Sequence, residues 1–243
     1  MKQFLKSLLA GLGYEIRGTR YTPRQLRDPA KLRLLTFDDA VCRYMFDHGP
    51  QLTFVQVGVF DGVTHDPLRK YIVKNNWDGV LVEPQSRAVK KRRELYSGND
   101  RIQIVHAALS PSKDRSPFFT IESDTAPAWS GGLASFDRET IFKHREQIPG
   151  IESMIREELV DCVPFDDVLS RLSRTPDILQ IDTEGADALV LSLFPFERVR
   201  PPLVHWEVKH LTVAQREQVL DRLSGFGYRF ASSGDEDMLA VNF

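Results

Sequence analysis

The stretch Phe54–Gly62, with the sequence FVQVGVFDG, constrains the fold of this chain more than any other segment. An apolar, β-branched run ends in two glycines and an aspartate, and a charged segment with a helical pattern follows. This composition is typical of a buried parallel strand meeting a tight turn, because glycine lets a ligand approach the backbone. An ordinary turn between core strands would explain the glycines alone equally well. The stretch therefore predicts a parallel α/β sheet with a candidate ligand site.

The next predicted strand, Gly79–Glu83, ends in an acid. In α/β folds that bind nucleosides, an acid at the tip of the second strand accepts hydrogen bonds from ribose hydroxyls. Glu83 occupies that place, at a suitable distance from Gly62. The two strands together therefore favour a nucleoside cofactor over a purely structural turn.

Strand and helix patterns alternate along most of the remaining chain, which is typical of a doubly wound parallel sheet. The last two strands have no helix between them, so they predict an antiparallel hairpin at a sheet edge. The expected fold is α/β and Rossmann-like, with a mostly parallel seven-stranded sheet and a C-terminal antiparallel hairpin. The further predicted strands are 101–108, 177–182, 203–208, 228–232 and 238–243.

Two segments depart from this alternation. The sequence predicts an N-terminal helical extension over residues 1–50 and the catalytic domain over residues 51–243. Within that domain, residues 111–160 read as an insertion, with a short strand at 117–121 and helical structure over 134–156. An insertion over such a sheet often shapes a substrate site, although a purely structural excursion is equally compatible with the sequence.

Charge and cysteine content restrict the partners. The net charge is −2, so we expect no nucleic-acid partner, and the basic run Lys90–Arg93 predicts a solvated helix face. Cys42 and Cys162 lack zinc-like spacing and indicate buried thiols in a reducing compartment. Residues 1–13 have an amphipathic pattern that is too short to span a bilayer. We therefore expect a cytoplasmic protein with no integral membrane segment, with weak peripheral membrane contact as the alternative. The oligomeric state stays open.

Four segments, in this order, carry a resemblance to a known family. They are Val55–Gly62, Gly79–Gln85, Leu179–Asp187, and Trp206–Glu207 with His210–Leu211. They resemble the FkbM-type methyltransferases, a family of S-adenosylmethionine-dependent enzymes that mostly methylate oxygen. The phrase Ile181–Gly185, IDTEG, is the most distinctive of these. The terminal hairpin agrees, because it is typical of the class I methyltransferase version of the Rossmann-like fold.

The resemblance implies S-adenosyl-L-methionine as the cofactor. Methyltransferases favour an acid two residues before the first glycine, and Gln56 stands there, so its contact would be a neutral hydrogen bond. Glycines allow backbone approach, and a carboxylate binds the ribose hydroxyls. The expected cofactor-binding residues are Gln56, Gly58, Asp61, Gly62, Glu83, Ala107, which would lie against adenine, and Asp182.

Methylation of a hydroxyl requires that the acceptor lose its proton, so a positioned base or a metal ion is needed. Ligands of this fold lie outside the carboxyl ends of the strands. Asp182 and Glu207 are expected there on adjacent strands, where either could act as base or the pair could bind a divalent cation. His210, just past the strand, is a third catalytic candidate. A helix cap for Asp182 and a salt bridge for Glu207 are the structural alternatives.

The expected acceptor is a small molecule or glycan, such as a sugar or another hydroxylated metabolite. Trp129, Ser135 and Phe136 in the insertion are candidates for its pocket, with core packing or loop anchoring as the alternative. A nicotinamide-dependent oxidoreductase is the competing enzyme class, although the first turn lacks the three-glycine fingerprint. A catalytically inactive interaction module is the non-enzyme alternative. The identity of the acceptor cannot be read from the sequence.

Overall fold

The computed structural model describes residues 36–58, 62–63, 66–123, 125–233 and 236–243. The predicted amphipathic helix over residues 1–13 and the candidate cofactor residue Asp61 lie outside the described residues.

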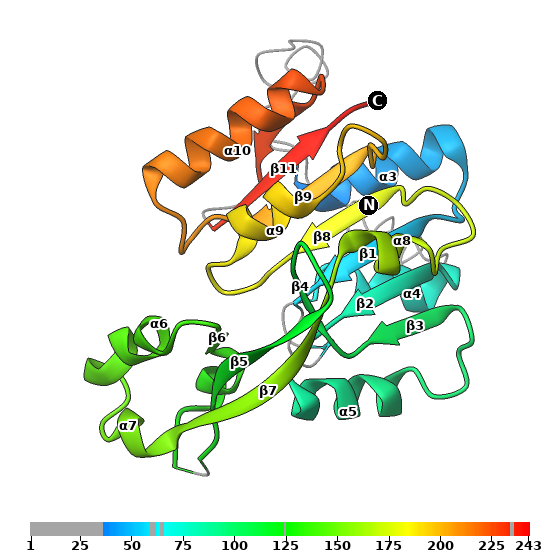
Figure 1. Cartoon of the computed structure of the whole chain (residues 1–243). Coiled ribbons are helices and arrows are strands. Elements are labelled where there is room, and N and C mark those ends of the chain that lie inside the picture. Colours follow the sequence, from blue (N-terminus) through cyan, green and yellow to red (C-terminus); the bar gives the residue numbers. More distant parts are fainter. Residues whose placement is uncertain (1–35, 59–61, 64–65, 124, 234–235) are drawn as a thin grey trace, which may run out of the picture. The chain divides into compact units, whose positions relative to one another are not determined.

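A seven-stranded sheet forms the centre of the described chain (Figure 1). The strands follow the order β10-β11-β9-β8-β1-β2-β3, and the five strands from β9 to β3 are mutually parallel. Strand β11 is antiparallel to both β9 and β10, which confirms the predicted hairpin and fold class. The strands are β1 (Thr53–Val57), β2 (Asp78–Val82), β3 (Ile102–Val105), β8 (Ile178–Ile181), β9 (Leu203–Glu207), β10 (Arg229–Ser232) and β11 (Asp237–Val241).

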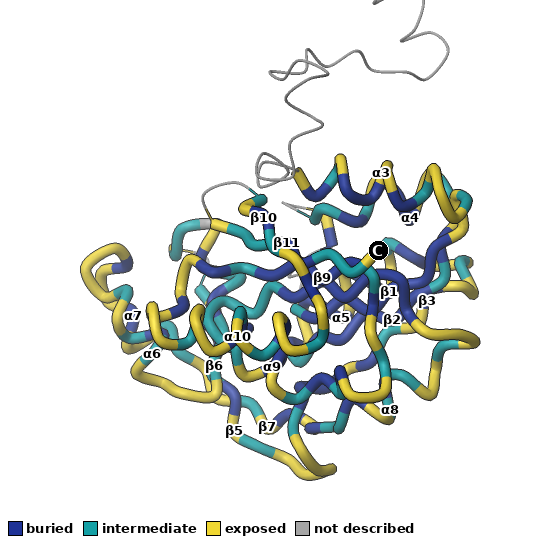
Figure 2. The backbone as a smooth tube through the Cα atoms, turned by 90° about the horizontal axis from the view of Figure 1, so that it is seen from above, coloured by how far each residue is buried: buried dark blue, intermediate teal, exposed yellow. Residues whose placement is uncertain are grey.

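Helices cover both faces of this sheet because alternate side chains of each strand point to opposite faces. On β1, Val55 and Val57 belong to one apolar core and Phe54 belongs to the other. In Figure 2 the buried backbone follows the central strands, whereas the outer turns of the helices are exposed. The first core includes residues of α8 (Phe165–Leu169), α9 (Asp187–Leu193) and α10 (Val213–Gly225), and the second includes residues of α3 (Phe37–His48) and α4 (Arg69–Asn75); α5 is Ser86–Leu95.

Helix α3 is fastened to the sheet by a polar contact as well as by its apolar side. Thr36 and Asp39 form a capping box that starts the helix. Further along, Tyr44 Oη donates to Asp177 Oδ1 at 3.1 Å, and the backbone N–H of Thr53 donates to Asp177 Oδ2 at 2.7 Å. The described end of the predicted N-terminal extension therefore packs on the same core as the sheet.

The insertion forms a second, four-stranded sheet with the order β4-β7-β5-β6. Its helical segments surround a small apolar core of Ile121, Leu133, Ile141, Ile148 and Ile151. The elements are β4 (Ala108–Leu109), β5 (Asp114–Ile121), η2 (Ala128–Gly132), β6 (Ala134–Ser135), α6 (Arg138–Phe142), η3 (Lys143–Glu146), α7 (Ile151–Met154) and β7 (Ile155–Val163).

Two predictions for this part of the chain were wrong in detail. The strand predicted at 101–108 is divided, because β3 pairs in the seven-stranded sheet while β4 pairs with β7. The helix predicted over 134–156 is three short helical segments. Pro149 and Gly150, with φ of +77° at the glycine, interrupt the helical pattern, and the chain turns into β7 from Ile155.

None of the helices in the described ranges is both long enough and apolar enough to cross a membrane.

Candidate functional site

The glycine turn after β1 lies directly against the end of β8. The Gly58 N–H donates to the carbonyl of Val82 at 3.0 Å, and the Asp182 N–H donates to the carbonyl of Val57 at 2.9 Å. Gly58 has a φ of +73°, and a Cβ placed on it would lie 2.2 Å from the backbone oxygen of Asp182. No side chain fits at this position. The turn therefore packs tightly against the backbone of Asp182, at the switch point of the sheet where ligands of such folds bind.

Replacing Gly58 with alanine is expected to lower the free energy of unfolding by more than about 2 kcal/mol, since a clash adds to the cost of positive φ. Gly98→Ala is the matched control, because Gly98 has a φ of +81° but no atom within 4 Å of its would-be Cβ. Its expected cost is only about 1 kcal/mol. Urea unfolding of the two variants measures the difference. Equal costs would show that the turn and the end of β8 are not in close contact.

Glu83 is buried at the end of β2 and already has protein partners. One carboxylate oxygen accepts a hydrogen bond from the Gln85 N–H at 3.0 Å, and the other accepts from Arg92 Nη2 at 3.3 Å. Burial raises the pKa of Glu83, although the Arg92 guanidinium opposes this shift. Arg92 is fully buried, so the prediction of a solvated basic face was wrong at this residue. A role of Glu83 in ribose binding stays a prediction.

Gln56 is also buried and engaged. Its side-chain amide donates to Asp66 Oδ1 at 2.9 Å, and the same oxygen accepts from the N–H groups of Leu68 and Arg69 at the start of α4. Asp66 thus caps the entrance to this helix, as its position before Pro67 indicates. Gln56 therefore connects β1 to the segment that begins α4.

The two other described cofactor candidates line the same end of the sheet. Gly62 has a φ of +68°, and a Cβ on it would meet Leu95 of α5 at 3.4 Å. Ala107 is buried in the short link between β3 and β4. Their contacts with a cofactor stay predictions.

A group of titratable side chains gathers where β8 and β9 end. Ile181 pairs with Trp206, so Asp182 and Glu207 lie side by side, as the parallel register predicts. His210 Nε2 lies 3.2 Å from Glu184 Oε2 and 3.8 Å from Glu207 Oε2. We call Asp182, Glu184, Glu207 and His210 the acid cluster. The structure thus brings the three predicted catalytic residues together and adds Glu184.

The backbone of the β8–α9 turn is shaped to present Glu184. This residue has a φ of +54°, an uncommon conformation for a side chain with a Cβ. The buried carboxylate of Asp187 holds the turn, accepting from the Gly185 N–H at 3.2 Å and the Thr183 N–H at 3.3 Å. Strained backbone of this kind is concentrated at functional sites.

Burial and mutual charge shift the pKa values of all four side chains in the acid cluster. Burial, reinforced by the Glu207 carboxylate, raises the pKa of Asp182 to about 8. Burial and the Glu184 carboxylate raise the pKa of Glu207 to about 7. The hydrogen bond between His210 and Glu184 raises the pKa of His210 and lowers the pKa of Glu184. The cluster therefore holds a hydrogen-bonded His210–Glu184 pair beside two carboxyl groups whose pKa values are raised to about 8 and about 7.

The acid cluster also has the spacing of a possible cation site. The ligand atoms of Glu184, Glu207 and His210 lie within 4.8 Å of one another. This set differs from the predicted pair of Asp182 and Glu207. Acidic groups of this kind are common without an ion, so the spacing alone assigns none.

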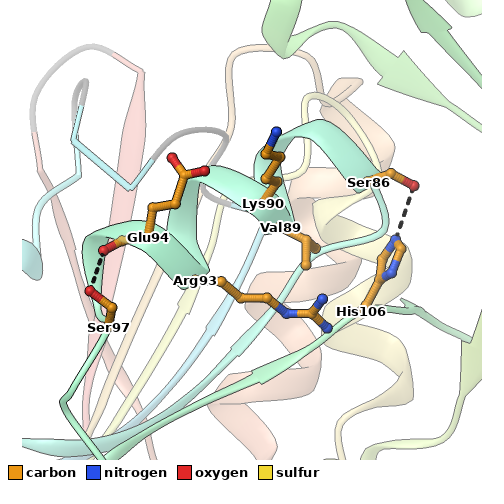
Figure 3. A pocket seen from close by; sticks show the side chains of 7 residues that line it. All are labelled: Ser86, Val89, Lys90, Arg93, Glu94, Ser97 and His106. Atoms are coloured by element: carbon orange, nitrogen blue, oxygen red, sulfur yellow. Dashed lines mark hydrogen bonds between the residues drawn. The ribbon is translucent and has the colours of Figure 1, made fainter.

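An open cavity of about 540 Å³ runs along α5, at the other end of the sheet's carboxyl edge (Figure 3). Arg93 points toward His106, which lies 3.3 Å from Ser86 Oγ and follows β3. The walls contain no member of the acid cluster, but they adjoin Glu83 and Ala107 along the chain. The cavity therefore borders the place predicted for ribose and adenine. Its lining residues are Ser86, Val89, Lys90, Arg93, Glu94, Ser97 and His106.

Comparison with known proteins identifies the family to which the sequence is similar. The family model described as "Methyltransferase FkbM domain" matches residues 56–230. A search of curated proteins found no match.

Solved structures of several methyltransferases are similar to this chain. One is the methyltransferase FkbM from Methylobacillus flagellatus KT, with 12% identity, a TM-score of 0.42 and coverage of 79% of this chain. This chain spans only 44% of that protein's length. The precorrin-6y C5,15-methyltransferase from Geobacter metallireducens GS-15 has 10% identity, a TM-score of 0.40 and coverage of 79% and 81% of the two chains. A human methyltransferase 10 domain-containing protein has 10% identity, a TM-score of 0.41 and coverage of 99% and 92%.

Proposed function

The chain belongs to the FkbM methyltransferase family, and from this premise we propose that it methylates a hydroxyl oxygen of a small molecule or glycan with S-adenosylmethionine as donor. Family membership supports methyl transfer, and the site supports a hydroxyl acceptor. The observation that carries the proposal is the contact between the Gly58 turn and Asp182. It brings the glycine turn after β1 against the end of β8, where burial raises the pKa of Asp182 to about 8 and the pKa of Glu207 to about 7.

The residues present suit such a donor. Gly58 lies so close to the backbone of Asp182 that no Cβ fits between them, and Gly62 is a second glycine with positive φ that follows β1. When bound, S-adenosylmethionine supplies a methyl group already activated by the sulfonium. The chain must then align the acceptor oxygen with that methyl group and remove the hydroxyl proton.

We assign the proton transfer to Asp182. It follows β8 and lies closest to the glycine turn, and burial raises its pKa to about 8, so its ionised form is a strong base whose population grows as pH rises toward 8. Glu207 and His210 are placed to hold the acceptor hydroxyl, and Glu184 orients His210 through their 3.2 Å contact. With such a donor bound, Asp182 would take the hydroxyl proton while the donor would supply the methyl group and leave as its neutral thioether.

Calorimetric titration tests the donor class. We expect S-adenosylmethionine and S-adenosylhomocysteine to bind with dissociation constants of order micromolar, on the scale of about −8 kcal/mol, and NAD not to bind. Glu83→Gln is expected to weaken both by about fivefold or more, since a charge-assisted hydrogen bond is lost. Glu217→Gln is the control, because Glu217 is exposed on α10 and does not line the cavity along α5.

Other results of this titration would favour one of the alternative functions. Binding of NAD in place of the other two compounds would favour the oxidoreductase reading. Binding of no adenosine compound would favour an inactive interaction module. Equal affinity of the Glu83→Gln and wild-type proteins would remove Glu83 from the ribose site.

A further inference from the structure

Strand β3 forms an open edge of the seven-stranded sheet. It is the last strand in the order, and among the described strands only β2 pairs with it. The backbone groups of successive residues in a strand point alternately to its two sides. The Val105 carbonyl accepts from the Glu83 N–H at 3.0 Å, so Val105 faces the β2 side. Its neighbour Ile104 therefore directs its N–H and C=O to the open edge.

The side chains of β3 give this edge little protection against pairing. Native sheets protect their open edges with charged side chains, with proline or with very short strands. β3 is short, with four residues, but its sequence IQIV carries no charge. At the opposite edge of the sheet, β10 carries Arg229. The edge of β3 is therefore the better place for a further extended segment to add to the sheet.

The cavity along α5 lies on the side of β3 that such a segment would face with half of its side chains. Ile104 packs against the core that α3 and α4 cover. Alternate residues of an extended chain share a face, so His106 lies on the same side as Ile104. His106 lines the cavity, and Figure 3 shows Arg93 pointing toward it from α5. Every second side chain of an added strand would therefore point toward the cavity.

The walls of this cavity are mainly basic. Lys90 and Arg93 are exposed on α5, and neither forms an ion pair with another described residue. His106 adds a third basic side chain, and Glu94 is the only acid among the described lining residues. Because Arg93 and His106 approach each other from two elements, an anionic group between them would bind both.

We propose that this surface binds an extended acidic segment of a partner protein, which pairs with β3 as a further strand. We call the cavity of Figure 3 together with the open edge of β3 the α5–β3 groove. Backbone hydrogen bonds to Ile104 fix the register of the segment, and carboxylates at every second residue meet Lys90 and Arg93. A basic segment is repelled by the same cations. Two copies of this chain are disfavoured as partners, because each would bring the same cations to the contact.

Binding of capped eight-residue peptides to the full chain tests this proposal. The probe alternates glutamate with valine, and a control peptide has lysine in place of glutamate. Fluorescence anisotropy of the labelled peptides measures affinity, and amide NMR of the chain locates the contact. We expect the glutamate peptide to bind, with shifts at Ile104 and His106 and weaker binding as salt is added, and the lysine peptide not to bind.

Two methylated peptides test strand pairing itself. One carries N-methyl groups on its glutamates and the other on its valines. In an added strand one of these two sets of N–H groups faces β3 and the other faces solvent. Only one of the two methylated peptides should therefore lose its binding. Loss in neither would show that the segment binds by charge alone.

Variants of the chain locate the contact independently. Replacing both Lys90 and Arg93 with glutamine is expected to raise the dissociation constant of the glutamate peptide by about tenfold, the scale of two exposed charge pairs. Arg87→Gln is the matched control, because Arg87 is exposed on α5 but does not line the cavity. Ile104→Pro removes the outward N–H without removing a bond to β2, and should abolish binding. If circular dichroism shows that this variant does not fold, the methylated peptides give the same information.

Four results would overturn the proposal. They are no binding of the glutamate peptide, equal binding of the lysine peptide, unchanged affinity when Lys90 and Arg93 are replaced, and unchanged binding of both methylated peptides. Tighter binding of an eight-nucleotide single-stranded RNA in this groove would replace it with a nucleic-acid site. Self-association of the chain that Ile104→Pro removes would replace it with an interface between copies. The outcome is independent of the donor titration, because the groove contains no member of the acid cluster.

Discussion

Asp182→Asn is expected to lower kcat by about 10²- to 10⁴-fold, which is the usual contribution of a general base. The measurement uses an identified methyl acceptor. An amide has nearly the shape of the carboxylate but cannot take up the hydroxyl proton. Asp182 meets Gly58 and Val57 through its backbone, so a change of its side chain leaves the contact between the glycine turn and β8 in place. Asp221→Asn, at an exposed carboxyl of α10, is the control and should keep full activity.

The same replacement is expected to stabilise the fold at neutral pH. The pKa of Asp182 is raised from its ordinary 3.8 to about 8, so between these values the native state binds more protons than the unfolded state. Stability contributed by this group is therefore lost as pH rises through that window. Asp182→Asn should raise the free energy of unfolding by about 1 kcal/mol or more at pH 8 and by little at pH 4. Urea unfolding at the two pH values measures the change.

The pH profile of the wild-type enzyme gives an independent check. A base with a pKa of about 8 predicts that kcat/KM rises with pH and levels above that value. Unchanged turnover by Asp182→Asn would move the proton acceptor to Glu207 or to the His210–Glu184 pair. Excess chelator should leave the rate unchanged, since Asp182 needs no ion. Loss of the rate, with recovery on adding Mg²⁺ or Mn²⁺, would instead place a cation among Glu184, Glu207 and His210.

Arg92→Met is expected to lower the free energy of unfolding by about 3 to 5 kcal/mol, the range for losing one partner of a buried ion pair. Methionine fills much of the space of the arginine stem but leaves Glu83 buried without its cation. The loss should be larger at pH 8 than at pH 4. Glu83 without Arg92 has a still higher pKa in the native state, so stability falls as pH rises above its ordinary value.

Two variants separate this effect from a general loss of charge on α5. Arg93→Met changes the adjacent, exposed arginine and should cost less than about 0.5 kcal/mol. The double variant Arg92→Met with Glu83→Gln removes both charges and should recover much of the lost stability. Thermal and urea unfolding compare the variants. A cost for Arg92→Met no greater than that for Arg93→Met would show that the ion pair contributes little.

Much of the fold could be predicted because its signals are local. Apolar, β-branched runs ending in glycine or an acid marked the parallel strands, and the missing helix before β11 marked the hairpin. The adjacency of Asp182 and Glu207 also follows from sequence, since the carboxyl ends of neighbouring parallel strands meet at one edge. These are consequences of strand geometry alone.

The remaining features depend on packing that no local pattern records. Lys90–Arg93 is uniformly basic, and only the position of α5 over Glu83 decides that Arg92 is the buried member. The contact between Glu184 and His210 depends on the φ of +54° at Glu184. A positive φ at a glutamate cannot be predicted from its residue type. Charged residues such as Glu157 and Glu158 obscure the strand pattern of β7, whereas Pro149–Gly150 is a stop signal that the sequence does contain.

The path of the chain through β4 and β7 has a consequence for how new specificities arise. Residues Ala108–Leu109 pair in parallel with Cys162–Val163, so everything between them departs from and returns to the main sheet at one place. A segment closed in this way has its own small core and shares few strand pairings with the rest. Recombination or grafting at that junction would exchange this segment as one unit and leave the seven-stranded sheet unchanged.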